Sequence, residues 1–212
     1  FTITRNGNTT QGTFSPYGAN WSNYFNGTDA YLSVPTSTAF DPGSGDFTIE
    51  FWAFSAPMQI GYICGQGNLT NSNGWTIYQY AASTGQNPTT KLSFLLNGTG
   101  SVYETTNSMV ANAWNHVAFV KSSTTWRVYI NGALSDTWTS VPTINASTSA
   151  LTVGRTSVWN ASYFWAGSLS NLRILKGTAL YSGSSITVPT GPLTAITNTS
   201  LLTCQSNRFI DN

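Results

Sequence analysis

Apolar and polar side chains alternate most regularly between Trp114 and Trp138, in the stretch WNHVAFVKSSTTWRVYINGALSDTW. This pattern predicts three consecutive antiparallel strands. Two runs of β-branched and aromatic residues are separated by polar residues 122–125, and the second run is closed by Asn131 and Gly132. Asn-Gly favours the tight type I′ turn, because both central residues of that turn need a positive φ. The stretch therefore predicts a local sheet built from neighbouring strands.

The first turn of this stretch also fixes which residues face one another. The predicted cross-strand pairs are Lys121 with Trp126, Phe119 with Val128, and Val117 with Ile130. These pairs form one apolar face that must be buried. The opposite face, with His116, Tyr129 and Arg127, is mixed, so it could meet solvent or a ligand. Across the Asn-Gly turn the same counting places Arg127 opposite Asp136. A sheet with one buried and one mixed face is typical of a two-sheet sandwich.

Shorter runs of the same kind recur along the chain between clusters of turn residues. Residues 47–54 are apolar on both faces, which predicts a central strand. Further strands are predicted over residues 31–34, 61–67, 75–80, 91–96, 102–106, 151–155, 168–175 and 201–204. We expect one helical turn over residues 176–181 and no amphipathic helix. The fold class is therefore all-β, an antiparallel β-sandwich, with residues 1–20 as a lead-in strand and linker and residues 21–212 as the domain.

Several motifs resemble a known family. They are WNHVA at residues 114–118, WRVYING at 126–132, FTIEFW at 47–52, LTVGR at 151–155 and WAGSLSNLRI at 165–174. Together they resemble the laminin-G-like branch of the concanavalin A-like lectin/glucanase superfamily, and the resemblance implies a concanavalin A-like jelly roll. That family contains lectins, glycosidases, adhesion modules and structural modules, so the resemblance does not choose a function.

The ends of the chain carry a second resemblance. Residues 175–181 (LKGTALY), 189–193 (PTGPL) and 201–209 (LLTCQSNRF) are similar to a module found in tail and other virion proteins of marine bacteriophages, particularly cyanophages. In that module a segment like residues 208–212 often continues into one like residues 1–4. The resemblance implies a virion-surface or extracellular location, with repeated or oligomeric copies contacting other virion or fibre subunits. Since the chain starts at Phe1 and carries no signal peptide, we expect a piece of a longer polypeptide.

Charge is sparse, which narrows the choice of partners. Only 7% of residues are charged, against roughly 25% in an average domain, and the net charge is +1. The basic residues form no run, so neither nucleic acid nor a membrane is predicted as a partner. Cys64 and Cys204 could form one bridge, but we expect two buried free thiols. A single His excludes the usual zinc ligand sets.

The acidic residues do not predict an enzyme. Glycosidases need two carboxylates facing one groove, but Glu50 is followed two residues later by Trp52 and has no second acid nearby. We expect Glu50 to be a buried acceptor for backbone or Trp N–H groups, and His116 to be a structural residue hydrogen-bonded opposite Asn131. No cofactor is predicted. Asp29 and Asp136 are conceivable calcium ligands, but no dense oxygen-ligand motif is present and calcium is not predicted.

Aromatic residues in predicted loops are the positive functional signal. Trp159, Asn160 and Tyr163 combine ring faces with a polar partner, and Tyr103 offers a second patch. Sugars present C–H faces that pack on such rings and hydroxyls that bond to polar groups. The alternatives are plain packing and contact between subunits. We expect a non-catalytic adhesion module that binds surface glycans of a host cell weakly and in many copies; the alternative is a structural decoration or fibre subunit of a phage particle.

Overall fold

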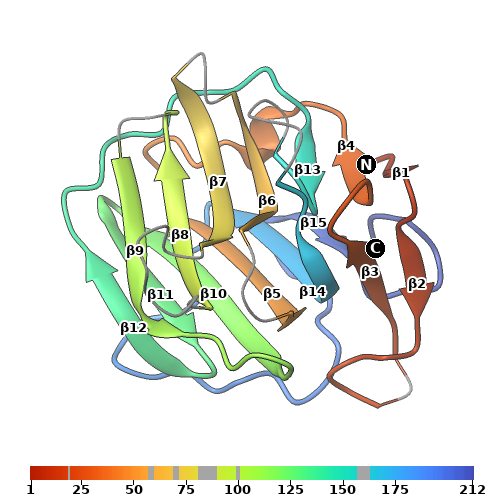
Figure 1. Cartoon of the computed structure of the whole chain (residues 1–212). Coiled ribbons are helices and arrows are strands. Elements are labelled where there is room, and N and C mark those ends of the chain that lie inside the picture. Colours follow the sequence, from red (N-terminus) through yellow and green to blue (C-terminus); the bar gives the residue numbers. More distant parts are fainter. Residues whose placement is uncertain (19, 57–59, 69–71, 81–89, 99–100, 157–162) are drawn as a thin grey trace.

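The computed structural model describes residues 1–18, 20–56, 60–68, 72–80, 90–98, 101–156 and 163–212, with the side chains of residues 68, 80 and 101 not described. Two antiparallel sheets face each other and form a sandwich (Figure 1). The strands are β1 (Thr4–Asn6), β2 (Thr10–Gly12), β3 (Ser22–Asn26), β4 (Tyr31–Val34), β5 (Phe47–Ser55), β6 (Gly61–Asn68), β7 (Asn73–Tyr80), β8 (Lys91–Leu96), β9 (Ser101–Ser108), β10 (Trp114–Ser122), β11 (Thr125–Ile130), β12 (Ala133–Trp138), β13 (Leu151–Val153), β14 (Ala166–Lys176) and β15 (Thr199–Thr203). The predicted antiparallel β-sandwich is therefore confirmed.

The strand order brings together strands that are far apart in the sequence. The seven-stranded sheet has the order β1-β4-β13-β6-β7-β8-β9, and the eight-stranded sheet has the order β12-β11-β10-β5-β14-β3-β2, with β15 also paired to β14. β5 lies between β10 and β14, as expected for a strand that is apolar on both faces. Most of these contacts are non-local, so the positions of side chains on the sheets depend on the whole topology.

The register predicted for the first hairpin is confirmed. β10 and β11 pair Lys121 with Trp126, Phe119 with Val128, and Val117 with Ile130, and all six side chains are buried. The five apolar residues among them join a core formed by the facing sides of both sheets, where Trp75, Trp126 and Trp165 are fully buried.

The predicted pairing of Arg127 with Asp136 is wrong. A β-bulge between β11 and β12 shifts the register, so Arg127 faces Thr137 and Asp136 faces Val128. The shift lets the Asp136 carboxylate accept hydrogen bonds from the backbone N–H (2.8 Å) and hydroxyl (2.7 Å) of Thr106 on β9, an edge strand of the other sheet. The bulge thus satisfies polar groups on an otherwise open edge.

Two other local predictions differ from the structure. Residues 177–181 form no helical turn; Gly177 has a φ of +89° and the chain runs extended across the eight-stranded sheet. The short 3₁₀ helix lies instead at η1 (Thr38–Phe40), where the Ser37 hydroxyl accepts a hydrogen bond from the N–H of Ala39. β3 was not among the predicted strands, although it pairs with β14. Within residues 1–20, β1 pairs with β4 and β2 pairs with β3.

The chain itself covers part of the mixed outer face of the eight-stranded sheet. Tyr181 and Ile186 pack over Val120 and Tyr129, and the Tyr129 hydroxyl donates to the Gly183 carbonyl (3.0 Å). These contacts come from residues 177–196, which we call the C-terminal strap. The part of this face around Val120 and Tyr129 is therefore not open to solvent or ligand, whereas Arg127 on the same face is half-exposed.

The two ends of the chain lie side by side at one edge of the sandwich (Figure 1). The amino group of Phe1 lies 2.7 Å from a carboxylate oxygen of Asp211, and Thr2 forms an antiparallel bridge with Ile210. The C-terminal Asn212 is held by its N–H, which donates to the Leu202 carbonyl at 2.8 Å. None of the described residues belongs to a helix long and apolar enough to cross a lipid bilayer.

Candidate functional site

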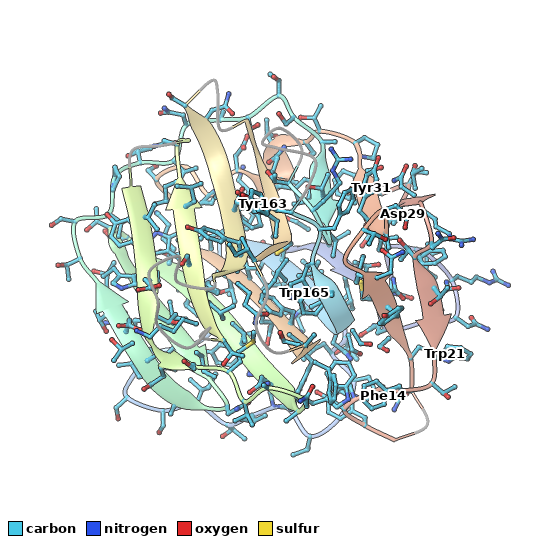
Figure 2. All side chains as sticks on the ribbon, viewed as in Figure 1. Phe14, Trp21, Asp29, Tyr31, Tyr163 and Trp165 are labelled. Carbon is cyan, nitrogen blue, oxygen red and sulfur yellow. The ribbon has the colours of Figure 1, made fainter. Side chains whose placement is uncertain are left out.

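Aromatic side chains gather on the outer face of the seven-stranded sheet, where β4 and β6 begin and β13 ends. We call this group, with the arginine beside it, the tyrosine band; its members are Tyr31, Tyr62, Tyr78, Tyr163, Phe164 and Arg155. Figure 2 shows the labelled Tyr31 and Tyr163 in the upper half of the view, away from Phe14 at its lower edge. The band is the candidate functional site.

Strand alternation explains why these rings face outward. On β4, Leu32 and Val34 are buried in the core, so Tyr31 points to the other side of the sheet. Tyr62 on β6 pairs directly with Tyr78 on β7, whereas Ile77 joins the core. Side chains from separate strands are therefore brought to one face.

The segment that carries Tyr163 is fixed to the sheet by backbone contacts. The N–H of Tyr62 donates to the Tyr163 carbonyl (3.3 Å), and the N–H of Trp165 donates to the Gly154 carbonyl (2.9 Å). The close approach needs a glycine at position 61, because a Cβ there would lie 2.6 Å from the Cα of Trp165. Trp165 is fully buried and anchors the segment from below.

The rings of the band contact one another and differ in exposure. Tyr62 lies between Tyr78 and Tyr163, with ring centroids at 5.4 and 6.2 Å. Tyr62 is 4% exposed and Tyr163 is 36% exposed, so Tyr163 forms the accessible rim. Burial, together with the neighbouring Tyr78 and Tyr163, raises the pKa of Tyr62 to about 12. The Tyr62 hydroxyl therefore stays protonated at neutral pH and can donate a hydrogen bond.

Arg155 continues the band toward β4. Its guanidinium carbon lies 4.5 Å from the ring centroid of Tyr31 and 5.5 Å from that of Phe164. Contacts of this length are attractive cation–π interactions. The Nε–H of Arg155 donates to the Thr156 carbonyl at 3.0 Å, which orients the guanidinium group. The band thus combines ring faces, hydroxyls and one cation.

The structure places the residues predicted from sequence in different surroundings. Tyr163 lies in the tyrosine band, whereas Trp159 and Asn160 lie outside the described residues. Tyr103 pairs with the core residue Phe94 and packs on Trp138 at 5.2 Å, so its ring points into the sandwich. Tyr103 and Tyr163 therefore lie on opposite faces of the seven-stranded sheet and do not form one site.

Sequence reasoning missed most of the band. Tyr31, Tyr62 and Tyr78 occupy alternating positions of predicted strands, but that pattern alone does not show which strands are neighbours. The order β4-β13-β6-β7 brings them together. Of the two aromatic residues that follow Tyr163, Trp165 is fully buried in the core and Phe164 is half-buried.

Glu50 lies on the other sheet, fully buried under the C-terminal strap. Its Oε1 accepts hydrogen bonds from Nε and Nη2 of Arg173, at 2.9 and 2.5 Å. Its Oε2 accepts the Tyr181 hydroxyl at 2.8 Å and lies 3.2 Å from Nε2 of His116. Glu50 is a buried acceptor as expected, but the expected partners, backbone or Trp N–H groups, are wrong. An arginine from β14 and a tyrosine from the strap take that role, because the strap closes over the strand.

The surroundings of Glu50 and His116 do not suit catalysis. Burial alone raises the pKa of Glu50, but the hydrogen bond from His116 and the charge and hydrogen bonds of Arg173 outweigh it, so the pKa lies below its usual value. Glu50 is thus an ionised carboxylate with both oxygens occupied. The backbone of His116 is hydrogen-bonded to Asn131, as predicted, and its side chain is fully buried. Neither residue is accessible to a substrate.

The residues considered for calcium are used by hydrogen bonds. Asp29 accepts from the side chains of Asn8 (3.0 Å) and Asn26 (2.6 Å), and Asp136 accepts from Thr106. Within the described part of the chain, no group of three or more His, Cys, Asp or Glu residues is arranged to hold a metal ion.

A second aromatic hollow lies on the outer face of the eight-stranded sheet. It has a volume of about 300 Å³ and is lined by Phe14, Tyr24, Phe54 and Ser168, among others. The Phe14 ring packs edge-on against Phe54 at 4.7 Å. Phe14 and Tyr24 are about half exposed, so they are exposed aromatic residues on a different surface from the tyrosine band and can serve as controls for it.

The architecture defines a class of protein: a two-sheet antiparallel jelly roll whose eight-stranded sheet is partly covered on its outer side by its own chain. A family model described as the concanavalin A-like lectin/glucanases superfamily, of laminin-G type, matches residues 26–181. The chain belongs to this superfamily. Comparison with curated proteins found no match.

Solved structures of low sequence identity share the fold. Domain 4 of AbnA, an extracellular GH43 arabinanase from Geobacillus stearothermophilus solved with arabinotriose, is 18% identical with a TM-score of 0.61, over 83% of this chain and 82% of that one. A putative carbohydrate-binding protein from Bacteroides ovatus is 16% identical with a TM-score of 0.57, over 96% of this chain and 52% of that one. The binding domain of Paraclostridial Mosquitocidal Protein 1 is 16% identical with a TM-score of 0.59, over 85% of this chain and 45% of that one. At these identities the likeness shows the fold alone.

Proposed function

We propose that this chain is a non-catalytic module that binds glycans at the tyrosine band. The observation that carries the proposal is the gathering of five aromatic rings, from three strands and from residues 163–164, on one outer face, with Tyr163 exposed at its rim. Ring faces pack against the C–H faces of sugars, and tyrosine hydroxyls provide donors and acceptors for sugar hydroxyls. Such an apolar platform with a few polar groups suits a carbohydrate.

The fold relatives support this proposal. The arabinanase domain was solved with a bound arabinotriose, and a second relative is described as a putative carbohydrate-binding protein. The superfamily itself is named for lectins and glucanases. The non-catalytic part of the proposal is supported by Glu50, which is sealed under the strap and has both oxygens engaged.

The proposed setting is an extracellular or virion surface that attaches to a host cell. The resemblance of the chain ends to virion modules supports this setting. A shallow site at the sheet surface would bind each glycan weakly, and many copies on one particle would raise the overall affinity. The sequence predictions Trp159 and Asn160 belong to this proposal as additional contacts.

A structural role is the second candidate function. β9 is an edge strand of the seven-stranded sheet, and Val102 on it is 56% exposed, with Val110 just beyond it 58% exposed. Apolar side chains at an exposed strand edge favour contact with another copy. This role predicts concentration-dependent association in light scattering, which Val102→Lys would abolish; association without glycan binding would favour it over attachment.

A glycan array probed with the 212-residue chain tests attachment. We expect at least one glycan to be bound, and Tyr163→Ala to weaken that binding about tenfold, which corresponds to about 1.4 kcal/mol. Trp159→Ala tests the sequence prediction in the same assay. Tyr24→Ala is the matched control, because Tyr24 is 47% exposed on the other sheet.

Two results would contradict the proposal. One is an array without any bound glycan. The other is a loss of binding in Tyr24→Ala that equals the loss in Tyr163→Ala, because the site would then not be the tyrosine band. Thermal unfolding of each variant shows whether the fold is intact, so that loss of binding is not confused with loss of structure.

A further inference from the structure

We propose that Arg155 makes the tyrosine band selective for acidic sugars, with the guanidinium group holding a carboxylate or a sulfate of the glycan. The inference rests on the proposed function, because it names the class of glycan that the same site binds. It is carried by the position of Arg155 and by the absence of a carboxylate partner for it in the chain.

The position of Arg155 leaves its end groups available. The guanidinium lies over Tyr31 and near Phe164, and its Nε–H is taken by the Thr156 carbonyl. Among the described residues no further acceptor contacts it. A guanidinium stacked on a ring keeps the N–H groups of its edge free to bind an anion with two parallel hydrogen bonds. Arg155 is half-buried beside the rings.

The acidic residues of the chain are engaged elsewhere. All of the seven Asp and Glu residues belong to the described part of the chain, and none forms an ion pair with Arg155. The partners of six are Asn8 and Asn26 for Asp29, Ser147 for Asp41, Ser123 for Asp46, Arg173 for Glu50, Thr106 for Asp136, and the Phe1 amine for Asp211. The charge of Arg155 is therefore not neutralised within the chain.

The seventh acid, Glu104, places a negative charge at the end of the tyrosine row that is opposite Arg155. Glu104 pairs with Ser93, which pairs with Tyr78, so it stands in the same cross-strand row as Tyr62 and Tyr78 but at the β9 end. Arg155 follows β13, four strands away, which is about 19 Å at the usual spacing of about 4.8 Å between strands. An acidic glycan is attracted at one end of the row and repelled at the other. We therefore place its acidic group beside Arg155 and its neutral part over the tyrosines.

Matched pairs of oligosaccharides test the inference. The probes are galacturonic acid oligomers against galactose oligomers, and sulfated against unsulfated lactose; the two pairs separate a carboxylate from a sulfate. Binding is titrated with the 212-residue chain and with Arg155→Gln and Arg155→Lys. We expect the acidic member of at least one pair to bind about tenfold more tightly than the neutral member, as for one charge-assisted pair of hydrogen bonds.

The variants should separate charge from stacking. Arg155→Gln should bring the ratio of the two affinities, acidic over neutral, to about one, and Arg155→Lys should retain part of the preference. For the unmodified chain, raising NaCl from about 50 mM to about 500 mM should weaken binding of the acidic member only. This salt test does not depend on any variant folding correctly.

The outcomes distinguish the two proposals. Binding of neutral and acidic members with equal affinity, or a preference that persists in Arg155→Gln, would overturn the inference and leave glycan binding intact. If neither member of any pair nor any arrayed glycan binds, both proposals are wrong.

Discussion

Removing one partner of the buried ion pair between Glu50 and Arg173 should strongly destabilise the fold at neutral pH. The two side chains are 0% and 6% exposed, and Nη2 of Arg173 lies 2.5 Å from Oε1 of Glu50. Arg173 also ties down the C-terminal strap, because its Nη1 donates to the Thr194 carbonyl at 2.8 Å. Arg173→Met keeps much of the apolar length of the side chain but leaves a buried carboxylate without its cation.

Removing one partner of a buried pair costs about 3–5 kcal/mol, because the other charge stays desolvated. For a chain of this length each kcal/mol lowers the unfolding midpoint by about 2–4 °C, so Arg173→Met should lower it by about 6–20 °C. Arg127→Met is the matched control. Arg127 lies on the same sheet, is half-exposed and forms no ion pair among the described residues, and its replacement should change stability by less than about 0.5 kcal/mol.

The pH dependence gives the sharper test. The pKa of Glu50 is lowered in the folded chain, so its stabilising contribution is complete above its ordinary pKa and is lost as pH falls through the lowered value. Arg173→Met removes a charge and hydrogen bonds that lower the pKa of Glu50, so this pKa should lie higher in the variant than in the unmodified chain. The variant then loses less stability than the unmodified chain as pH falls. The difference in unfolding free energy between the unmodified chain and Arg173→Met should therefore shrink between about pH 7 and about pH 4.

Urea denaturation followed by tryptophan fluorescence at both pH values measures this difference. A gap that stays the same at both pH values would refute the electrostatic explanation. The loss would then come from packing and from the strap contact at Thr194. A change below about 1 kcal/mol at neutral pH would refute the larger claim that the buried pair is important for the fold.

Two further predictions follow from close packing and burial. Gly61→Ala should destabilise the chain by about 1–3 kcal/mol in urea denaturation, because the added methyl would lie 2.6 Å from the Cα of Trp165. Gly45→Ala is the control and should be nearly neutral, because its added methyl meets open space; equal effects of the two variants would contradict the packing argument. Burial raises the pKa of the Cys204 thiol to about 12 and raises that of Cys64 further. Neither thiol should therefore react with Ellman's reagent at neutral pH until the chain is unfolded. Rapid reaction of the folded chain would contradict their burial.

Local patterns predicted the local parts of the fold. The hairpin of β10 and β11 has the predicted register because its pairs follow from one turn and strict alternation. One strand later the same counting was wrong, because Ser135 is an extra residue in β12. Nothing in its composition marks it as a bulge. Its role becomes visible only when β9 of the other sheet is in place, since its hydroxyl accepts the N–H of Asn107 (3.1 Å).

The site and the covered face depend on contacts between distant segments. Tyr163 was predicted from its own loop, whereas Tyr31 and Tyr62 could not be assigned to a common site before the order of β4, β13 and β6 was known. The mixed face around His116 has the composition of an exposed surface. It is buried because residues 177–196, which have no strand pattern, are held across it by hydrogen bonds such as that from the Leu193 N–H to Asn171 (2.8 Å). The periodicity of the sequence does not predict that these residues cover the face.

The pairing of Thr2 with Ile210 has a mechanical consequence. A load transmitted through both ends of the chain would act on two neighbouring points at one corner of the sandwich. Such a load should break the bonds between the terminal segments, such as the Phe1–Asp211 ion pair, one after another before it acts on the two sheets. The terminal segments should then extend first, while the surface around Tyr163 keeps its structure.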